Sequence, residues 1–197
     1  MELEIIKGRS QGHQLLLDQM FCLRKEVFFD RLGWDVCVEN GMEIDKYDDQ
    51  SAVYMVAHDK AKVQAGWRLL PTSGPNMLQD VFPELAAGEQ IPSSNKIWEI
   101  SRWAAVACDR DLRAQAHANA STMQLIKCAY DFARENDIER YLVVTSVAME
   151  RLCKSIGLPI SRFGDQRATR IGQVLSVACW VDINDVFHNV VYPSKAA

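Results

Sequence analysis

Residues 97–103, with the sequence IWEISRW, constrain the fold of this chain more than any other stretch. Their aromatic and β-branched side chains predict a β-strand. Because side chains alternate along a strand, Glu99 and Arg102 are expected to point to opposite faces. Each charged group would then lie among bulky apolar neighbours, where it needs a partner. From this strand alone, the simplest interpretation is that Glu99 and Arg102 each complete a structural ion pair.

The rest of the chain alternates between strand and helix patterns. Strands are predicted at residues 1–7, 53–57, 63–70, 141–146 and 174–183, and helices at residues 11–30, 77–82, 112–136 and 148–155. The short polar link 58–62 predicts an antiparallel hairpin, whereas the long helix 112–136 predicts a crossover between strands. This mixture predicts an α/β fold: a single domain over residues 1–197, built as an αβα sandwich with a mixed sheet. The end of the chain is expected to fray.

Residues 31–50 form a long segment without hydrophobic periodicity. They include Gly33, Trp34 and Gly41, and residues 39–49 contain five acids and one lysine. Irregular segments of this length inside a compact domain are usually functional or disordered. We therefore expect residues 31–50 to form a mobile lid over a binding site.

Charge and composition limit the partners of the chain. The formal net charge of −4 argues against general nucleic-acid binding, because phosphate contacts need a basic surface. The cysteines and histidines lack metal-ligand spacing, so no metal site is expected. The N-terminal residues lack the pattern of a signal peptide, and no run approaches the ~20 apolar residues of a membrane span. These features predict a cytoplasmic protein.

A set of short motifs occurs in order along the first half of the chain. The motifs are Arg24-x-x-x-Phe28, Trp34, Asp45-x-x-Asp48, Arg68-Leu-Leu-Pro-Thr-x-Gly-Pro, Phe82-Pro and Trp98-Glu99-x-Ser101-Arg102. As a set they resemble the acyl-homoserine-lactone synthases, the autoinducer synthases of the LuxI type. The resemblance covers residues 1 to about 106, and beyond them only Thr145 and residues 149–152 resemble the family. Trp103 is a difference, because the family pattern leads one to expect Phe there.

The resemblance implies a fold similar to the GNAT N-acetyltransferases and a reaction between S-adenosylmethionine and an acyl thioester. The donor would be acyl carrier protein or, as an alternative, CoA. The products would be an N-acyl-homoserine lactone, 5′-methylthioadenosine and the free thiol, with no resident cofactor. The family's charged positions correspond to Arg24, Asp45, Asp48, Arg68, Glu99 and Arg102, and its aromatic positions to Phe28, Trp34 and Phe82.

The reaction needs a base, because an amine must lose its proton before it attacks a thioester. Glu99 is the best candidate, since its apolar neighbours would disfavour its charged form. Ser101, on the same face of the strand, is expected to position a water molecule. Trp103 would add bulk beside the charged groups. An ion pair with an arginine and a positioning role in the ground state stay open as alternatives for Glu99.

The remaining charged and aromatic motif residues fit a cationic substrate. Asp45 and Asp48 suit the sulfonium and ammonium groups of S-adenosylmethionine. The arginines are expected mainly to brace the acids, with binding of the substrate carboxylate as the alternative. Phe28 and Trp34 are expected to stack on the adenine or to face the sulfonium, although core packing is the simpler interpretation for Phe28.

The second half of the chain, residues 107–197, is expected to hold the acyl chain and the carrier. The predicted lining of the acyl pocket is Met123, Ile126, Val143, Thr145, Val147, Met149 and Leu152. Thr145 stands out because its hydroxyl could bond an oxygen at C3 of the chain, or the backbone instead. The bases predicted to dock an acidic carrier protein are Arg151, Lys154, Arg162, Arg167 and Arg170.

Two other functions fit parts of the sequence. An ordinary GNAT-type N-acyltransferase would use acyl-CoA and another amine. Its pyrophosphate usually lies on a glycine-rich loop that opens a helix, and residues 107–115 contain no glycine. A non-catalytic binding protein on the same fold is the third possibility, which activity measurements would exclude.

Overall fold

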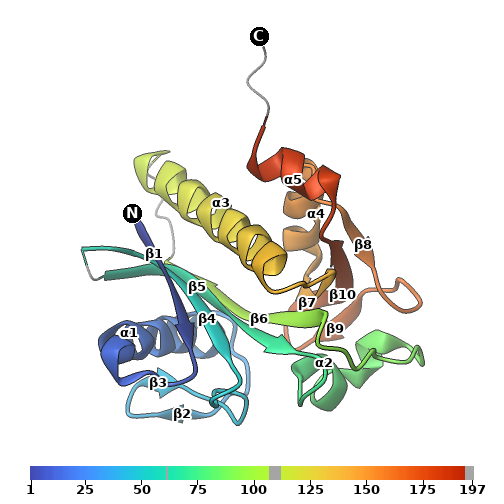
Figure 1. Ribbon diagram of the computed structural model, residues 1–197. Helices are drawn as coiled ribbons and strands as arrows, with labels where there is room; N and C mark the ends of the chain where they lie inside the picture. The colour runs from blue at the N-terminus through green and yellow to red at the C-terminus, as the bar shows by residue number, and fades with distance from the viewer. Residues whose placement is uncertain (61, 107–111, 194–197) are drawn as a thin grey trace. The chain divides into compact units, whose positions relative to one another are not determined.

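A computed structural model describes residues 1–60, 62–106 and 112–193, without the side chains of residues 112–119 (Figure 1). The chain divides into two compact units. The first unit consists of Met1–Leu69 with Arg102–Ala129, and the second consists of Leu70–Ser101 with Tyr130–Ala197. Residues 107–115, the stretch in which the sequence lacks the glycines of a pyrophosphate-binding loop, lie partly outside the described residues, because residues 107–111 are not described.

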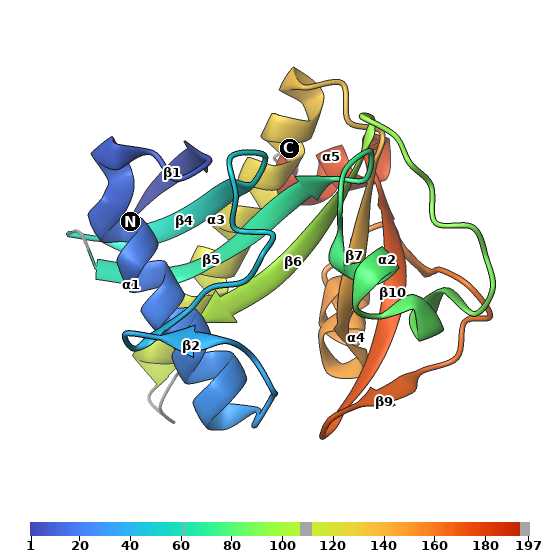
Figure 2. The ribbon, with the colours of Figure 1, turned by 90° about the horizontal axis from the view of Figure 1, so that it is seen from below.

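Antiparallel pairing joins three strands of the first unit. β1 (Glu2–Lys7) pairs with β4 (Val53–Asp59), and β4 pairs with β5 (Lys62–Pro71), which confirms the predicted hairpin. Residues 53–58 are all buried, as expected for a strand that is covered on both faces. Figures 1 and 2 show α1 (Gln14–Lys25) on one face of these strands and α3 (Leu112–Glu135) on the other. The layers confirm the predicted αβα arrangement.

Helix α1 lies very close to the strands at Gly66. A Cβ atom added there would lie 3.0 Å from the carbonyl oxygen of Met55 and 3.2 Å from the sulfur of Met20. Met20 lies on α1 and is fully buried. A glycine at position 66 therefore lets the helix pack directly against the backbone of β4 and β5.

The segment after α1 has more regular structure than the sequence predicts. A short 3-10 helix (Gln11–His13) precedes α1, and a π-helix (Glu26–Arg31) extends it. β2 (Val38–Glu39) and β3 (Met42–Glu43) then form a hairpin. Its turn residues Asn40 and Gly41 have φ of +52° and +78°, the left-handed pair that a type I′ turn requires. The prediction that residues 31–50 are irregular throughout is therefore wrong at the hairpin.

The second unit combines parallel and antiparallel pairing. Residues 97–100 of β6 (Ile97–Ala105) pair in parallel with β7 (Arg140–Ser146). β10 (Val174–Asp182) pairs antiparallel with β7, and also with two strands that the sequence did not predict, β8 (Ile160–Arg162) and β9 (Thr169–Ile171). This pairing confirms the predicted mixed sheet with a helical crossover.

Helices cover the strands of the second unit. α4 (Val147–Ser155) packs against β7 and β10, and Figure 2 shows it alongside them. α2 (Met77–Asp80) and a 3-10 helix (Pro83–Ala86) contribute to an apolar cluster of Leu78, Leu85, Ala86, Leu142, Phe163 and Ala178. The C-terminal residues form α5 (Asp185–Val191), so the prediction of a frayed end is wrong up to residue 191.

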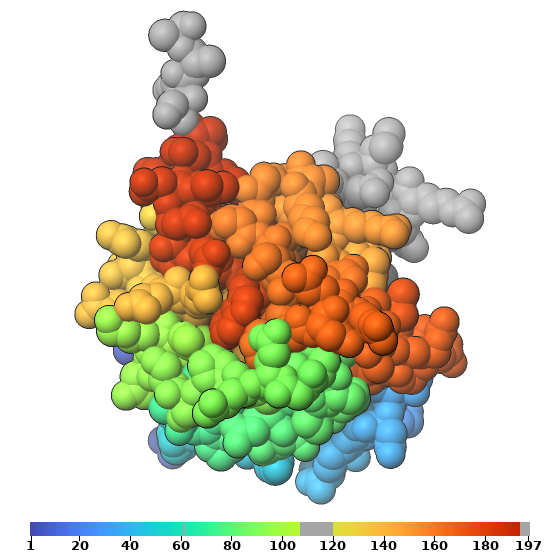
Figure 3. Space-filling model, turned by 90° about the vertical axis from the view of Figure 1, so that its right-hand side faces the viewer, coloured from blue at the N-terminus to red at the C-terminus, as the bar shows by residue number. Residues whose placement is uncertain are grey.

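A tight approach joins two surface segments of the second unit. Gly164 has φ of +72°, and a Cβ atom there would lie 2.8 Å from the carbonyl oxygen of Ala86. Only glycine fits both this backbone conformation and this spacing. Figure 3 shows the two segments side by side on the surface, residues 72–95 in green and the segment around residue 164 in orange.

Candidate active site

Three arginines and three acids form a buried ion-pair cluster in the first unit. Its members are Arg24 on α1, Glu43 on β3, Asp45 and Asp48 in the following loop, Arg68 on β5 and Arg102 on β6. We call this set the ion-pair cluster. The arginines pair with Asp45 and Asp48, two of the three acids that they were expected to brace, and with Glu43, which was not predicted.

Arg24 lies at the centre of the ion-pair cluster. Its side chain is fully buried. Its Nη1 and Nη2 donate to the two carboxylate oxygens of Asp48 at 2.8 and 2.9 Å, and its Nε donates to Glu43. Such bidentate pairing suits the planar guanidinium. Arg24 therefore joins α1 to both β3 and the acidic loop.

Asp45 is the acid of the ion-pair cluster that solvent reaches. Its side chain is 14% exposed, whereas those of Glu43 and Asp48 are 0% exposed. It accepts hydrogen bonds from Arg68, and Arg102 lies 2.9 Å away. A cationic ligand would reach this carboxylate more easily than the other two.

Burial opposes charge within the ion-pair cluster; pairing outweighs it at Asp48 and Arg24 but not at Arg102, where burial lowers the pKa. Burial alone would raise the pKa of Asp48, yet Arg24 and Arg68 hold this pKa far below its usual range. Burial would lower the pKa of Arg24, whereas Asp48 and Glu43 raise it. The pairing of Arg24 with Asp48 therefore maintains both of their charges.

Two tyrosines that the sequence did not single out complete the ion-pair cluster. Tyr54 on β4 donates from its hydroxyl to Asp48 at 3.0 Å. Burial and the neighbouring Asp48 raise the pKa of Tyr54, which keeps the donor proton in place. The guanidinium of Arg68 lies 5.5 Å from the ring centroid of Tyr47. Tyr54 could have been suspected of a polar role, because it carries the one hydroxyl group in the otherwise apolar stretch 53–57.

Phe28 and Trp34, the two aromatic residues predicted to contact the substrate, stack on each other. The rings of Phe28 and Trp34 lie 5.2 Å apart at an interplanar angle of 20°. The guanidinium of Arg102 lies 5.4 Å from the centroid of Phe28, a cation–π distance. The indole N–H of Trp34 is among the buried polar atoms in the described residues that have no hydrogen-bond partner. The stack therefore places an aromatic surface directly beside the ion-pair cluster.

Glu99 is fully buried in the second unit. Its Oε1 accepts a hydrogen bond from the backbone N–H of Met77 at 3.1 Å, and its Oε2 accepts one from Leu78 at 2.7 Å. Both donors lie at the start of α2, where the helix dipole also favours a negative charge. Ser101 is buried on the same strand. Glu99 is thus held by backbone amides, which sequence reasoning did not foresee.

Strand alternation does not continue regularly through Arg102. This residue has φ of +55°, in the left-handed region that side chains disfavour. Trp103 follows as a half-buried residue whose indole N–H is another buried donor without a partner in the described residues. The backbone at Arg102 therefore departs from regular strand geometry.

The residues predicted to line the acyl pocket lie in three elements. Met123 and Ile126 lie on α3, Val143 and Thr145 on β7, and Val147, Met149 and Leu152 on α4. Most are buried or half-buried, but Leu152 is 44% exposed. Phe82, predicted as a family aromatic position, packs against the apolar cluster of the second unit.

Two of the five bases predicted to dock the carrier protein, Lys154 and Arg162, form ion pairs with a buried acid, Glu150. Glu150 accepts hydrogen bonds from Lys154 at 2.7 Å and from Arg162 at 2.9 and 2.7 Å. These bonds, with that of Arg162 as the largest cause, lower the pKa of Glu150 to about 2. Arg151, Arg167 and Arg170 are exposed. Glu150 was not predicted, and its i to i+4 spacing from Lys154 was the available signal.

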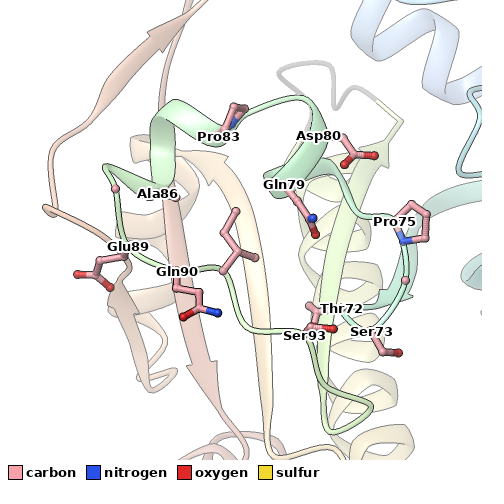
Figure 4. A pocket seen from close by; sticks show the side chains of 13 residues that line it. Thr72, Ser73, Pro75, Gln79, Asp80, Pro83, Ala86, Glu89, Gln90 and Ser93 are labelled. Atoms are coloured by element: carbon pink, nitrogen blue, oxygen red, sulfur yellow. The ribbon is translucent and has the colours of Figure 1, made fainter.

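A surface pocket of about 720 Å³ opens beside α2 (Figure 4). Its described lining includes Gln79 and Asp80 of α2 and residues of the segments 72–75 and 83–93, but none of the predicted acyl-pocket residues. Asp80 and Glu89 contribute carboxylates. The lining in the described part of the chain has no basic side chain, so the pocket is poorly suited to an anionic carrier.

The described residues contain no group of three or more His, Cys, Asp or Glu side chains arranged to hold a metal ion. Among the helices described, none combines the length and the apolar character that crossing a membrane requires.

Known proteins resemble the chain along most of its length. Residues 9–190 match the family described as autoinducer synthase. An acyl-homoserine-lactone synthase from Aliivibrio fischeri is 39% identical over 170 residues, 86% of this chain and 87% of the relative. A second one, from Pseudomonas aeruginosa, is 36% identical over 182 residues, which cover 91% and 88% of the two chains.

Solved structures agree with these relatives. The acyl-homoserine-lactone synthase LasI has a TM-score of 0.86 and 34% identity, covering 100% of this chain and 98% of its own. BjaI, a CoA-dependent synthase solved with S-adenosylmethionine and isopentyl-CoA, has a TM-score of 0.82 and 29% identity, covering 98% and 90%. An N-acetyltransferase from Lactobacillus plantarum, 14% identical with a TM-score of 0.58 and covering 93% and 100%, shows the shared fold alone. The chain therefore belongs to the autoinducer synthase family.

Proposed function

We propose that this protein makes N-acyl-homoserine lactones for quorum sensing, as expected of an acyltransferase in this family. The amine of S-adenosylmethionine attacks the carbonyl carbon of an acyl thioester and expels the thiol. The carboxylate of the product then attacks its own γ-carbon, which breaks the bond to sulfur and releases 5′-methylthioadenosine. S-adenosylmethionine is consumed in these two steps, because its parts end up in the lactone and in 5′-methylthioadenosine. It therefore acts as a substrate rather than as a cofactor.

Glu99 is the proposed base for the first step. The observation that supports this role is a fully buried carboxylate whose two oxygens are each fixed by a backbone N–H. A carboxylate has about four lone-pair sites, so backbone bonds that fix its orientation are compatible with acceptance of a proton. Ser101 is proposed to orient the water that relays this proton. A fixed base close to its working geometry is what general-base catalysis needs.

The Glu99→Gln variant tests this assignment. Its amide cannot accept a proton, so turnover is expected to fall by roughly 10²–10⁴-fold. Binding of S-adenosylmethionine, measured by calorimetry, is expected to change much less. An equal loss in both would make Glu99 a binding residue. Release of thiol without 5′-methylthioadenosine from the wild-type protein would instead favour an N-acyltransferase that acts on another amine.

The ion-pair cluster is the proposed binding site for S-adenosylmethionine. Asp45 is its most exposed acid and would attract the cationic groups of the substrate. The stacked Phe28 and Trp34 offer an aromatic surface for the sulfonium or the adenine. Trp103, next to Arg102 in the chain, is proposed as a further contact. Residues 31–50, which carry Asp45, would act as the lid that excludes water from the thioester.

The acyl chain is proposed to bind in the second half of the chain, along β7 and α4 of the second unit. Val143, Thr145, Val147 and Met149 are half-buried there, so part of each side chain is available for contact. Thr145 would distinguish a chain oxidised at C3 by a hydrogen bond. The exposure of Leu152 makes it a residue of the pocket entrance rather than of its interior.

Acyl carrier protein is the proposed donor, with acyl-CoA as the second possibility. Arg151, Arg167 and Arg170 are exposed bases that suit an acidic carrier, whereas Glu150 restrains Lys154 and Arg162. The enzyme is proposed to act in the cytoplasm, where both substrates are produced. Comparing the rates with acyl carrier protein and acyl-CoA thioesters of the same chain would decide the donor.

A further inference from the structure

The helix that holds Glu99 is too short to fix its own geometry. α2 spans Met77–Asp80, only 4 residues, and isolated helices below about 12–15 residues are marginal in water. Its shape must therefore come from contacts made by its ends and sides. Its first two backbone N–H groups, those of Met77 and Leu78, donate to Glu99. The next N–H, that of Gln79, donates to the side chain of Asn76 at 3.1 Å.

Asn76 is itself rigidly held. Its side chain is fully buried. While its Oδ1 caps Gln79, its Nδ2 donates to the carbonyl oxygen of Gly74 at 3.2 Å and lies 3.4 Å from the Oε1 of Gln79. Asn76 therefore links the turn before α2 to the first turn of the helix, and it is a favoured residue for this N-cap position.

The packing around α2 makes Asn76 important for holding the helix in its orientation. Leu78 anchors one side of the helix in the apolar cluster of the second unit. Gln79 and Asp80 lie on the side that borders the open pocket, as Figure 4 shows. A helix that is packed mainly on one side has fewer contacts that oppose its rotation. The N-cap is one of these contacts, together with the burial of Met77.

We propose that Asn76 is a positioning residue for the acyl transfer: by capping α2 it aims the N–H groups of Met77 and Leu78 at Glu99. The carboxylate of Glu99 is then held in the orientation that proton abstraction needs. This inference rests on the proposed role of Glu99 as the base. Asn76 itself contacts the cap and the turn, and it acts on the reaction through Glu99.

The test compares Asn76→Ala and Asn76→Ser with Glu99→Gln. Asn76→Ala is expected to lower kcat by roughly tenfold to hundredfold, because small displacements of a catalytic group have effects of this size. The KM for S-adenosylmethionine is expected to stay within about twofold, since binding does not need the base. Asn76→Ser keeps an oxygen acceptor and is expected to recover most of kcat.

Asn184→Ala is the matched control. Asn184 caps α5 with the same geometry, accepting from the N–H of Phe187 at 3.1 Å. The Asn184→Ala variant shows the effect of losing an N-cap on a helix that does not hold Glu99. Its kcat is expected to stay at the wild-type value. Thermal unfolding of both alanine variants then shows whether they lose similar stability.

The outcomes separate the two proposals. A wild-type kcat in Glu99→Gln would overturn the role of Glu99. A slow Glu99→Gln with a normal Asn76→Ala would overturn the positioning role alone. So would an Asn76→Ser variant as slow as Asn76→Ala, or a parallel loss of kcat in Asn184→Ala. If Asn76→Ala does not fold, the kcat of Asn76→Ser decides, because a value near that of Glu99→Gln contradicts the proposal.

Discussion

The two units of this synthase satisfy buried carboxylates in different ways. In the first unit, Asp48 accepts hydrogen bonds from the side chains of Arg24, Arg68 and Tyr54, beside one from the backbone N–H of Asp45. In the second unit, the donors described for Glu99 are backbone amides of one short helix. The first arrangement depends on which side chains are present. The second depends on how a segment of backbone is folded, so the two should respond differently to substitution and to pH.

The largest effect is expected from removing the central base of the ion-pair cluster. Arg24→Met leaves Glu43 and Asp48 buried without their main donor, which should cost about 3–5 kcal/mol of unfolding free energy. Urea unfolding measures this loss. Lys25→Met is the control, because the adjacent Lys25 forms a part-exposed pair with Asp30 that should contribute about 1 kcal/mol or less. Similar losses in both variants would show that the cluster is not a structural element.

A second test concerns Glu150, a buried acid held by partly exposed bases. Its pKa in the folded state is about 2, below its ordinary value of 4.5. Its pairing therefore stabilises the fold above the ordinary value, and this stabilisation is lost as the pH falls from about 4.5 towards 2. Glu150→Gln should cost roughly 1–2 kcal/mol at pH 7 after allowance for solvent screening, and much less at pH 2. Urea unfolding of the wild-type protein and of Glu150→Gln between pH 2 and pH 7 measures this difference. Curves of unfolding free energy against pH that run parallel for the two proteins would contradict the expectation.

Tyr54→Phe removes one donor from Asp48 but leaves both arginines. The loss of a buried hydrogen bond to a charged acceptor should cost about 1–2 kcal/mol, less than the loss of Arg24. Tyr192→Phe is the matched control, since the hydroxyl of Tyr192 donates to Asp131 at 2.7 Å on the exposed surface. Its effect on thermal stability should stay within about 0.5 kcal/mol. Equal effects would mean that burial adds nothing to the bond at Asp48.

The smallest effect is expected at the surface. Arg167→Glu should raise the KM for an acyl carrier protein thioester about three- to tenfold at low salt, and the effect should shrink as salt screens the charge. The rate with acyl-CoA should not change. Lys7→Glu reverses an exposed base in the first unit and serves as control. An equal rise in KM for both variants would indicate general electrostatics rather than a docking site.

The elements that the sequence predicted correctly are those with a strong local pattern. The strand-like residues 53–57 and 63–70 with their short polar link predicted the hairpin, and the helical spacing predicted α1 and α3. β8 and β9 have 3 residues each, too few to show a period. α5 has 7 residues, and its signal was the N-cap Asn184 rather than its hydrophobic pattern.

Glu43 was missed although a local signal existed. The pair Asn40-Gly41 is a strong hairpin signal, and it would have placed Glu43 in a strand beside the acidic loop. Instead, Glu43 was one of five acids in a segment without periodicity. The motif set supplied Arg24, Asp45, Asp48 and Arg68, but only the fold identifies which acid completes the charge balance.

The partners of Glu99 lie beyond what local sequence patterns encode. Its bonds join residues that are 21 and 22 positions apart, so they depend on how the turn after β5 returns to β6. The spacing of Asn76 and Gln79 is that of an N-cap and its third residue, a signal for the start of a helix. It predicts a cap but gives no indication of what the capped helix would hold.

The left-handed backbone of Arg102 has a consequence for engineering. A residue with a side chain in this conformation carries a strain of about 1 kcal/mol, which glycine would relieve. Glycine would also remove the guanidinium that pairs with Glu43 and Asp45 and faces Phe28. Removing one partner of a buried ion pair costs about 3–5 kcal/mol, more than the strain that glycine would relieve. The pairing of Arg102 therefore holds a strained backbone in place, and a search for thermostable variants should leave position 102 unchanged.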